Sequence, residues 1–249
     1  MSSRRKSPVN LVTTEEHNCS IDLRLKILAR LPFFAGLSQQ DLEAVNHRFI
    51  ETGYEASQPV YHTGDSAERL FVVADGKVKL LQHTTGGRDV LLDLLTCGEF
   101  FGALTVLGAE TYSDTAVAQT STCVLSIRAD AFAEILEAHP NLALKALKIM
   151  ADRLGDAYQR VSQLSAFTAE KRIAVTLLKL ARKFGSQQKD MLLIDVPLSR
   201  DDIAEMTGST PETASRVISQ YQSAGILTSG RLWIGVLDLA GLEKEIGQE

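Results

Sequence analysis

One short stretch near the C-terminus carries side chains whose types and spacing suit the reading of DNA bases. Glu212, Ser215 and Arg216 stand at positions i, i+3 and i+4, so a helix would present them on one face. Arginine can donate two hydrogen bonds to guanine O6 and N7, and glutamate can accept one from cytosine N4. Serine can contact a base edge or the thymine methyl group. The three side chains therefore predict direct base contacts in a major groove.

The residues around this face predict a helix-turn-helix that would position it. Ser199 and Asp202 suit the cap of a first helix over 200–207, and Gly208 supplies the left-handed turn that follows. Proline is favoured at the first position of a helix, so the second helix is expected to start at Pro211. Three apolar residues would bury its inner side: Val217, Ile218 and Tyr221. The N-terminal end of such a helix enters the major groove.

A second set of polar side chains is expected to contact phosphates, which orient a protein without reading sequence: Arg200, Thr210 and Thr213. The alternative interpretation is a solvated helix surface on which Glu212 and Arg216 form an i, i+4 ion pair. The turn motif around the helix favours the DNA-reading interpretation.

The segments on either side of this motif complete a small domain. An amphipathic helix is expected over 168–185, with Gly185 as its C-terminal cap. A loop over 187–190 and a strand over 191–197 follow. After the second helix, a β-hairpin is expected with residues 229–230 at its tip. The pattern is that of a winged helix-turn-helix.

Upstream of this domain the sequence predicts a long helix that begins beyond Pro140. Its apolar residues alternate spacings of three and four: Leu147, Met150, Leu154, Ala157, Val161 and Leu164. Such spacing defines an a/d seam over about three heptads. A core helix is the alternative, but the other faces are charged, which favours a dimer coiled coil.

The middle of the chain has a β pattern. Between residues 49 and 127, short β-favouring runs alternate with the turn signals TGD, ADGK and TTGGR. Asp75-Gly76 lies between two such runs and is a hairpin signal. Two short helices precede the strands, the second capped by Ser38. The expected fold class is α+β, with a β-sandwich or jelly-roll-like barrel at its centre.

Composition excludes several classes of protein. The formal net charge of −5 and a pI near 5.6 argue against a chain that coats nucleic acid non-specifically. Apolar runs are too short for a membrane helix and no secretory signal is recognised, so the chain is expected to be cytoplasmic. The three cysteines are widely spaced, and no metal motif, P-loop or nucleophile–base–acid pattern stands out. We therefore expect neither an enzyme nor a metal protein.

From about residue 24 onward the chain resembles the Crp/Fnr superfamily of bacterial transcription regulators. PFFAGLS, the TGD turn, DGKVKL, CGEFFG and LSRDDIAEMTGSTPETASR stand where that family has counterparts. The resemblance implies a cyclic-nucleotide-binding-like β-roll, a long dimerisation helix and a C-terminal winged helix-turn-helix. The expected boundaries are a disordered tail over 1–20, an effector domain over 21–139, the dimerisation helix over 140–166 and the DNA-binding domain over 167–249.

The resemblance also bears on the DNA sequence that is read. The cAMP-receptor type has an arginine directly before the glutamate, whereas this chain has Pro211. Glu212, Ser215 and Arg216 match the Fnr type, which implies an inverted repeat with TTGA-like half-sites. By the same analogy, residues 187–190 and the surface of the β-domain are candidates for touching RNA polymerase.

The expected effector pocket departs from the cAMP-binding members. Its candidate residues are Gly102, Ala103, Leu104, Tyr112 and Ser113. In the cAMP-binding members a glutamate that holds the ribose occupies the position of Ala103, and an arginine that holds the phosphate falls near Tyr112. No arginine or lysine occurs between Gly102 and Val124. Burying a cyclic phosphate without a cation costs several kcal/mol, so we expect no tight binding of cAMP or cGMP.

Other signals stay open at this point. An Fnr-type iron–sulfur cluster is disfavoured because only Cys19 remains of the N-terminal cysteine cluster. Haem sensing and thiol redox are alternatives: the histidines concerned are His47, His62 and His83, and the thiols are Cys97 and Cys123. An apolar effector or none at all fits the pocket best, so we expect no cofactor. The alternatives are a ligand-independent regulator controlled by its abundance, a β-domain that senses for an enzyme, and a structural dimer without a DNA role.

Overall fold

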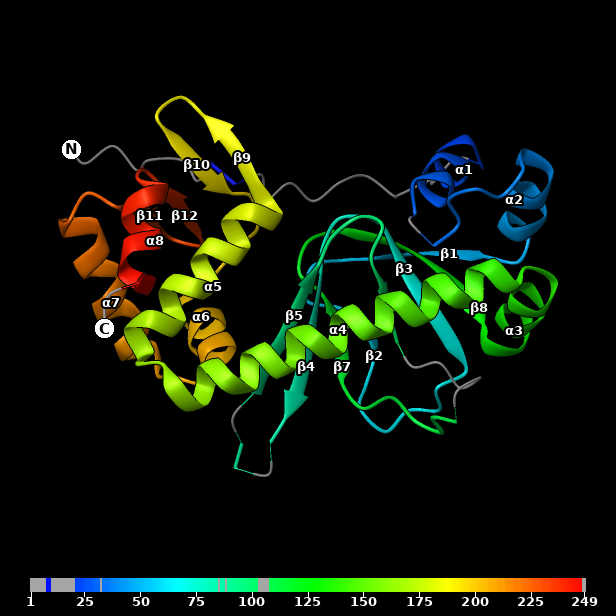
Figure 1. Cartoon of the computed structure of the whole chain (residues 1–249), viewed down its shortest axis with the longest axis horizontal. Helices are drawn as coiled ribbons and strands as arrows, with labels where there is room; N and C mark the ends of the chain where they lie inside the picture. Colours follow the sequence, from blue (N-terminus) through cyan, green and yellow to red (C-terminus); the bar gives the residue numbers. More distant parts are fainter. Residues whose placement is uncertain are drawn as a thin grey trace. The chain divides into compact units, whose positions relative to one another are not determined.

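The computed structural model describes residues 8–9, 21–31, 33–84, 86–87, 89–102 and 108–247. It divides into two compact units, one over residues 12–157 and the other over 158–249 together with residues 1–11. The long helix α4 (Pro140–Ala166) begins in the first unit and ends in the second (Figure 1). The expected tail over 1–20 and Cys19 lie outside the described residues, apart from residues 8 and 9.

The first unit is a two-sheet β-roll with short helices on one side. Its strands are β1 (Ile50–Tyr54), β2 (Pro59–Tyr61), β3 (Arg69–Asp75), β4 (Val78–His83), β5 (Asp89–Leu95), β6 (Phe100–Phe101), β7 (Thr115–Ala118) and β8 (Thr122–Arg128). They form two four-stranded sheets in the orders β1-β8-β3-β6 and β2-β7-β4-β5. The helices are α1 (Ile21–Arg30), α2 (Gln39–Asn46) and α3 (Ala129–Ala138). Together with the second unit, this confirms the predicted α+β class.

Strands β3 and β8 explain how the roll is held together. Side chains of a strand alternate between its two faces, and here both faces are buried. Val72 and Leu125 belong to an apolar cluster with the helices, which includes Phe132 of α3. Phe71 and Val124 belong to a second cluster that draws on both sheets. The roll therefore has an aromatic-rich interior between its sheets, and this is the place of the expected effector pocket.

The hairpin predicted at Asp75-Gly76 is wrong. The strands before and after it lie in different sheets, because β3 pairs with β8 and β6 and so has both edges occupied. The chain leaves β3 at Gly76, whose φ of +82° belongs to the left-handed region. A Cβ there would meet the carbonyl oxygen of Ser121 and the side chain of Thr122. The glycine thus serves a crossing between sheets, not a hairpin.

The second unit contains the expected helix-turn-helix and a four-stranded sheet. Its elements are α5 (Ala169–Phe184), β9 (Gly185–Gln188), β10 (Met191–Ile194), α6 (Arg200–Thr207), α7 (Pro211–Ser223), β11 (Leu227–Gly230), β12 (Trp233–Val236) and α8 (Leu239–Gly247). The strand order is β11-β12-β10-β9. In Figure 1 the elements of this unit from α5 to α8 run in colour from yellow-green to red.

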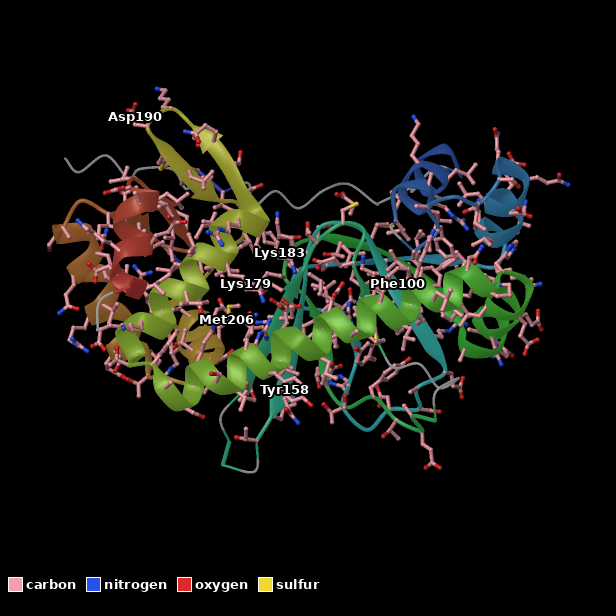
Figure 2. All side chains as sticks on the ribbon, viewed as in Figure 1. Phe100, Tyr158, Lys179, Lys183, Asp190 and Met206 are labelled. Atoms are coloured by element: carbon pink, nitrogen blue, oxygen red, sulfur yellow. The ribbon has the colours of Figure 1, made fainter. Side chains whose placement is uncertain are left out.

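The prediction of Gly185 as the C-terminal cap of α5 is confirmed, and its φ of −65° and ψ of 123° carry the chain straight into β9. One detail around the sheet differs from the prediction. The first half of the expected loop over 187–190 belongs to β9, and only Lys189 and Asp190 form the turn to β10. Asp190 is labelled at this turn in Figure 2.

The tip of the wing is also displaced from its predicted place. Gly230 pairs with Trp233, so the turn is made by Arg231 and Leu232 and not by residues 229–230. Leu232 takes the positive φ of 61°. A Cβ on Gly230 would meet the indole ring of Trp233. The glycine therefore makes room for its cross-strand partner and does not shape the turn.

Most residues of helix α4 are exposed in the single chain. Leu142 is its only buried residue, and all of α4 is described. Leu147, Leu154, Tyr158, Val161 and Leu164 are 52% to 67% exposed, and Tyr158 is labelled in Figure 2. Among the helices that the structure describes, none combines the length and the apolar character needed to cross a membrane.

Candidate functional site

The helix-turn-helix is set by caps that the sequence specifies locally. The Ser199 hydroxyl accepts from the backbone N–H of Asp202, whose carboxylate accepts from the N–H of Ser199 in return. Gly208 ends α6 with φ 58° and ψ 40°, the left-handed conformation that glycine adopts without strain. Thr210 caps α7 by accepting from the N–H of Thr213. The caps of α6 are those that the sequence predicts, and together with the Thr210 cap they confirm α6 over 200–207 and the start of α7 at Pro211.

The predicted base-contacting side chains share the outer face of α7. Glu212 and Arg216 are exposed and Ser215 is half-buried. The opposite face is buried through four residues: Ala214, Val217, Ile218 and Tyr221. The helix therefore presents a polar surface along its N-terminal half while its inner side is fixed in the core.

Arg216 is held by a residue that the sequence analysis did not single out. Its Nη2 donates to Oε1 of Glu170 on α5 at 2.7 Å. This hydrogen bond is the main reason why the pKa of Glu170 is lowered. The partner is thus Glu170 and not the i, i+4 residue Glu212 of the alternative interpretation. The Glu212 carboxylate instead interacts with its own backbone N–H and with Thr210, which lowers its pKa.

The three expected phosphate contacts are engaged within the domain. Nη2 of Arg200 donates to the Ser229 hydroxyl on the wing at 2.8 Å, and burial lowers the pKa of this arginine. The hydroxyl of Thr210 serves the cap of α7 and also donates to the Thr213 hydroxyl at 3.2 Å. Arg200 joins α6 to the wing, whereas the two threonines lie at the exposed start of α7.

Arg172 is a second residue that sequence reasoning did not assign. Its guanidinium donates to the carbonyl oxygens of Thr207 at 2.7 Å, Phe167 at 2.9 Å and Gly208 at 3.3 Å. These bonds satisfy carbonyls at the turn of the helix-turn-helix and at the junction before α5. Partners 35 and 36 residues apart leave no periodic signal in a sequence.

In the first unit, the expected effector pocket is occupied by aromatic side chains. Tyr112 is 4% exposed and stacks on Tyr61, with ring centroids 3.9 Å apart. Its hydroxyl donates to the Arg69 carbonyl oxygen at 2.9 Å. Gly102 has φ +90°, and a Cβ there would lie 3.0 Å from the Phe71 ring.

Of the other expected pocket residues, Ser113 is exposed and does not belong to this cluster, and Ala103 and Leu104 lie outside the described residues. Beside the cluster lies the carboxylate of Asp114, which the sequence analysis did not consider. Its Oδ1 accepts from the Tyr61 hydroxyl at 2.8 Å. Burial raises the pKa of Asp114, and the hydrogen bond from Tyr61 and the nearby charge of Arg153 oppose the rise.

The remaining candidates for sensing chemistry are dispersed. Within the described part of the chain, histidines, cysteines and carboxylates do not gather into a group that could hold a metal ion. His83 pairs with Asp89 at 2.6 Å on exposed strand ends. The exposed Cys97 donates its thiol to the Ala74 carbonyl oxygen, and Cys123 is fully buried in β8.

A β-roll followed by a long helix and a winged helix-turn-helix defines a DNA-binding transcription regulator. Residues 51–139 match the cyclic nucleotide-binding domain family, and residues 171–245 match the Crp-like helix-turn-helix domain family. The chain is 30% identical to the cyclic AMP receptor protein of Thermus thermophilus, over 86% of this chain and 95% of that protein. The chain belongs to the Crp/Fnr family of transcription regulators.

Two further comparisons agree with this assignment. The transcriptional activator protein FnrA of Stutzerimonas stutzeri is 28% identical over 83% of this chain and 84% of its own length. The structure of FixK2 from Bradyrhizobium japonicum superposes with a TM-score of 0.72 at 25% identity, covering 81% of this chain and 98% of FixK2.

Proposed function

We propose that the chain acts as a homodimer that binds an inverted DNA repeat with TTGA-like half-sites, and that cAMP is not its signal. The observation that carries the proposal is the outer face of α7. There Glu212, Ser215 and Arg216 lie together at the N-terminal half of a helix whose other side is buried. Because such a helix reads the major groove with these residue types, the face supports base-specific binding.

The half-site rests on the residues that differ between the two branches of the family. Pro211 fills the first position of α7 and supplies no side-chain donor, whereas the cAMP-receptor type has an arginine there. Glu212, Ser215 and Arg216 keep the Fnr type. The similarity to FnrA of Stutzerimonas stutzeri over most of both chains is in keeping with this choice. Thr210 and Thr213 are proposed to contact phosphates directly. Arg200 is proposed to act on phosphate contacts indirectly, by holding the wing in place.

The dimer rests on α4. Burying apolar surface contributes roughly 25 cal/mol per Å², and a helix that exposes a stripe of large apolar residues gains most from a second copy. The stripe contains four of the six predicted seam residues, Leu147, Leu154, Val161 and Leu164, and Tyr158 beside them. A parallel pairing would place two recognition helices on one duplex, as an inverted repeat requires.

The proposed independence from cAMP rests on the side chains that fill the interior of the β-roll. Tyr112 stacks with Tyr61 near the position where cAMP-binding relatives keep a phosphate-binding arginine. Asp114 adds a carboxylate beside this stack, which would repel a phosphate. A neutral effector, or control by abundance alone, remains compatible with this interior. The turn at Lys189 and Asp190 is the proposed contact with RNA polymerase.

The test of DNA reading is an electrophoretic mobility shift with the full chain. Wild-type protein is expected to prefer a TTGA-containing inverted repeat over the same duplex with each half-site guanine replaced. Arg216→Ala is expected to lose this preference, since one bidentate arginine contributes about 1–3 kcal/mol of discrimination. An Arg216→Ala protein with the wild-type preference would refute the proposed reading face.

The test of effector independence is titration calorimetry with cAMP and cGMP. We expect no micromolar binding to the purified protein. The affinity for DNA should be the same without any nucleotide and in the presence of either compound. Micromolar heats of binding, or DNA binding that appears only with cAMP, would refute this part of the proposal.

A further inference from the structure

The first turn of α5 is fastened to the helix-turn-helix at several points around Glu170. The Tyr221 hydroxyl on α7 donates to the Glu170 carbonyl oxygen at 3.2 Å. Burial raises the pKa of Tyr221 to about 12, so the phenol remains a donor at neutral pH. Two residues further on, Arg172 binds the carbonyls of Thr207 and Gly208. The backbone of Glu170 is therefore fixed relative to the recognition helix.

From this fixed backbone the Glu170 side chain reaches Arg216. The bond of 2.7 Å uses one N–H of the Nη2 group. A guanidinium has five N–H donors in a rigid fork, so other donors are left for a base edge. An exposed arginine without a partner samples many rotamers, and ordering it on DNA costs free energy. A partner that already holds the side chain lowers that cost.

We propose that Glu170 is a positioning residue for DNA specificity, which orients the Arg216 guanidinium for a guanine. It acts through Arg216 and touches no base itself. The inference rests on the proposed role of Arg216 in reading DNA. An exposed ion pair contributes little to the stability of the fold, so the effect of Glu170 is expected in recognition.

The test compares specific and non-specific binding of the full-length chain. A selection from a random duplex pool with wild-type protein defines the preferred site, and a second duplex carries adenine in place of each half-site guanine. The ratio of the two affinities is the readout, because loss of folding or of general charge attraction would not change it selectively. Glu170→Ala is expected to lower this ratio about two- to tenfold, the cost of ordering one long side chain.

A matched control comes from a second exposed pair in the same unit. Nη2 of Arg182 binds Oε1 of Glu243 at 2.9 Å, between α5 and α8. Glu243→Ala removes the same charge and the same kind of pair away from the recognition helix, and the ratio should stay at the wild-type value. If Glu170→Ala does not fold, Glu170→Gln removes the charge alone and is expected to lower the ratio as well.

Three outcomes decide the inference. If Arg216→Ala keeps the preference for guanine, the proposed function itself fails. If Arg216→Ala loses the preference for guanine but Glu170→Ala and Glu170→Gln both keep the wild-type ratio, only the role of Glu170 fails. This holds even if the two Glu170 variants bind both duplexes more tightly by the same factor. Adding Glu170→Ala to Arg216→Ala should lower the ratio no further, and a further loss would show a direct action of Glu170 and overturn positioning.

Discussion

The ring of Tyr112 stacks on that of Tyr61 at 3.9 Å between centroids, with an interplanar angle of 20°. Phe71 and Phe101 extend the cluster, with their centroids 5.2 Å apart. These four rings belong to the apolar cluster between the sheets of the β-roll. In this chain the interior of a cyclic-nucleotide-binding fold is thus built as an aromatic core.

Replacing Tyr112 tests whether this core stabilises the roll. Tyr112→Ala removes a buried ring and should lower the free energy of unfolding by about 3–5 kcal/mol, as other buried aromatic truncations do. Tyr112→Phe keeps the ring and removes only the hydroxyl, which donates to the Arg69 carbonyl oxygen and accepts from the Arg69 N–H, so its cost should be about 1–2 kcal/mol. Thermal and urea unfolding of both variants provide the measurement. Equal stabilities of the two variants would contradict the role of the stacked ring.

The local signals in this sequence were the ones that predicted structure. Ser199, Asp202 and Gly208 act on backbone groups at most four residues away, so their identities were sufficient to place α6. Likewise Ser38 caps α2 as expected, by accepting from the N–H of Asp41. Such caps depend on residue type and short spacing, both of which a sequence displays.

The contacts that define the two sites cannot be predicted from short-range patterns in one sequence. Glu170 and Arg216 are 46 residues apart, and Tyr61 and Asp114 are 53 apart. The Asp75-Gly76 signal does not distinguish a hairpin from a crossing between sheets, and only the pairing of β3 with β8 and β6 excludes a hairpin. Long-range partners are chosen by tertiary packing and leave no periodic trace in one sequence.

A charge placed on the exposed stripe of α4 should separate the proposed dimer. Leu154 is 54% exposed in the single chain, so Leu154→Asp leaves the fold of one chain intact. In a dimer the new carboxylate would be buried without a partner, which costs several kcal/mol. Sedimentation velocity should show a monomer, and affinity for the inverted repeat should fall by at least about tenfold.

Gln159 supplies the control for this substitution. It is exposed on α4 away from the predicted a and d positions, so Gln159→Asp adds the same charge off the stripe. This variant should sediment and bind DNA like the wild type. A Leu154→Asp protein that remained dimeric would place the interface on another surface.

The half-buried carboxylate of Asp114 leads to a prediction about pH. Burial holds its pKa above the ordinary value of 3.8 in the folded protein. The folded chain therefore binds this proton more tightly than the unfolded chain, and ionisation of Asp114 costs stability as the pH rises through its folded pKa. Asp114→Asn is neutral at every pH and keeps an oxygen that can accept from the Tyr61 hydroxyl.

We expect Asp114→Asn to raise the free energy of unfolding at pH 7 relative to the wild type. The gain should shrink as the pH falls through the folded pKa of Asp114 and vanish below about 3.8, where the wild-type carboxyl is protonated in both states. Urea unfolding of both proteins across this range measures it. Asp114→Ala, which also removes the acceptor for Tyr61, should gain less. A gain in stability that is independent of pH, or larger in acid, would contradict the proposed cost of ionising Asp114. Only an ionised and desolvated Asp114 can produce a gain that grows towards neutral pH.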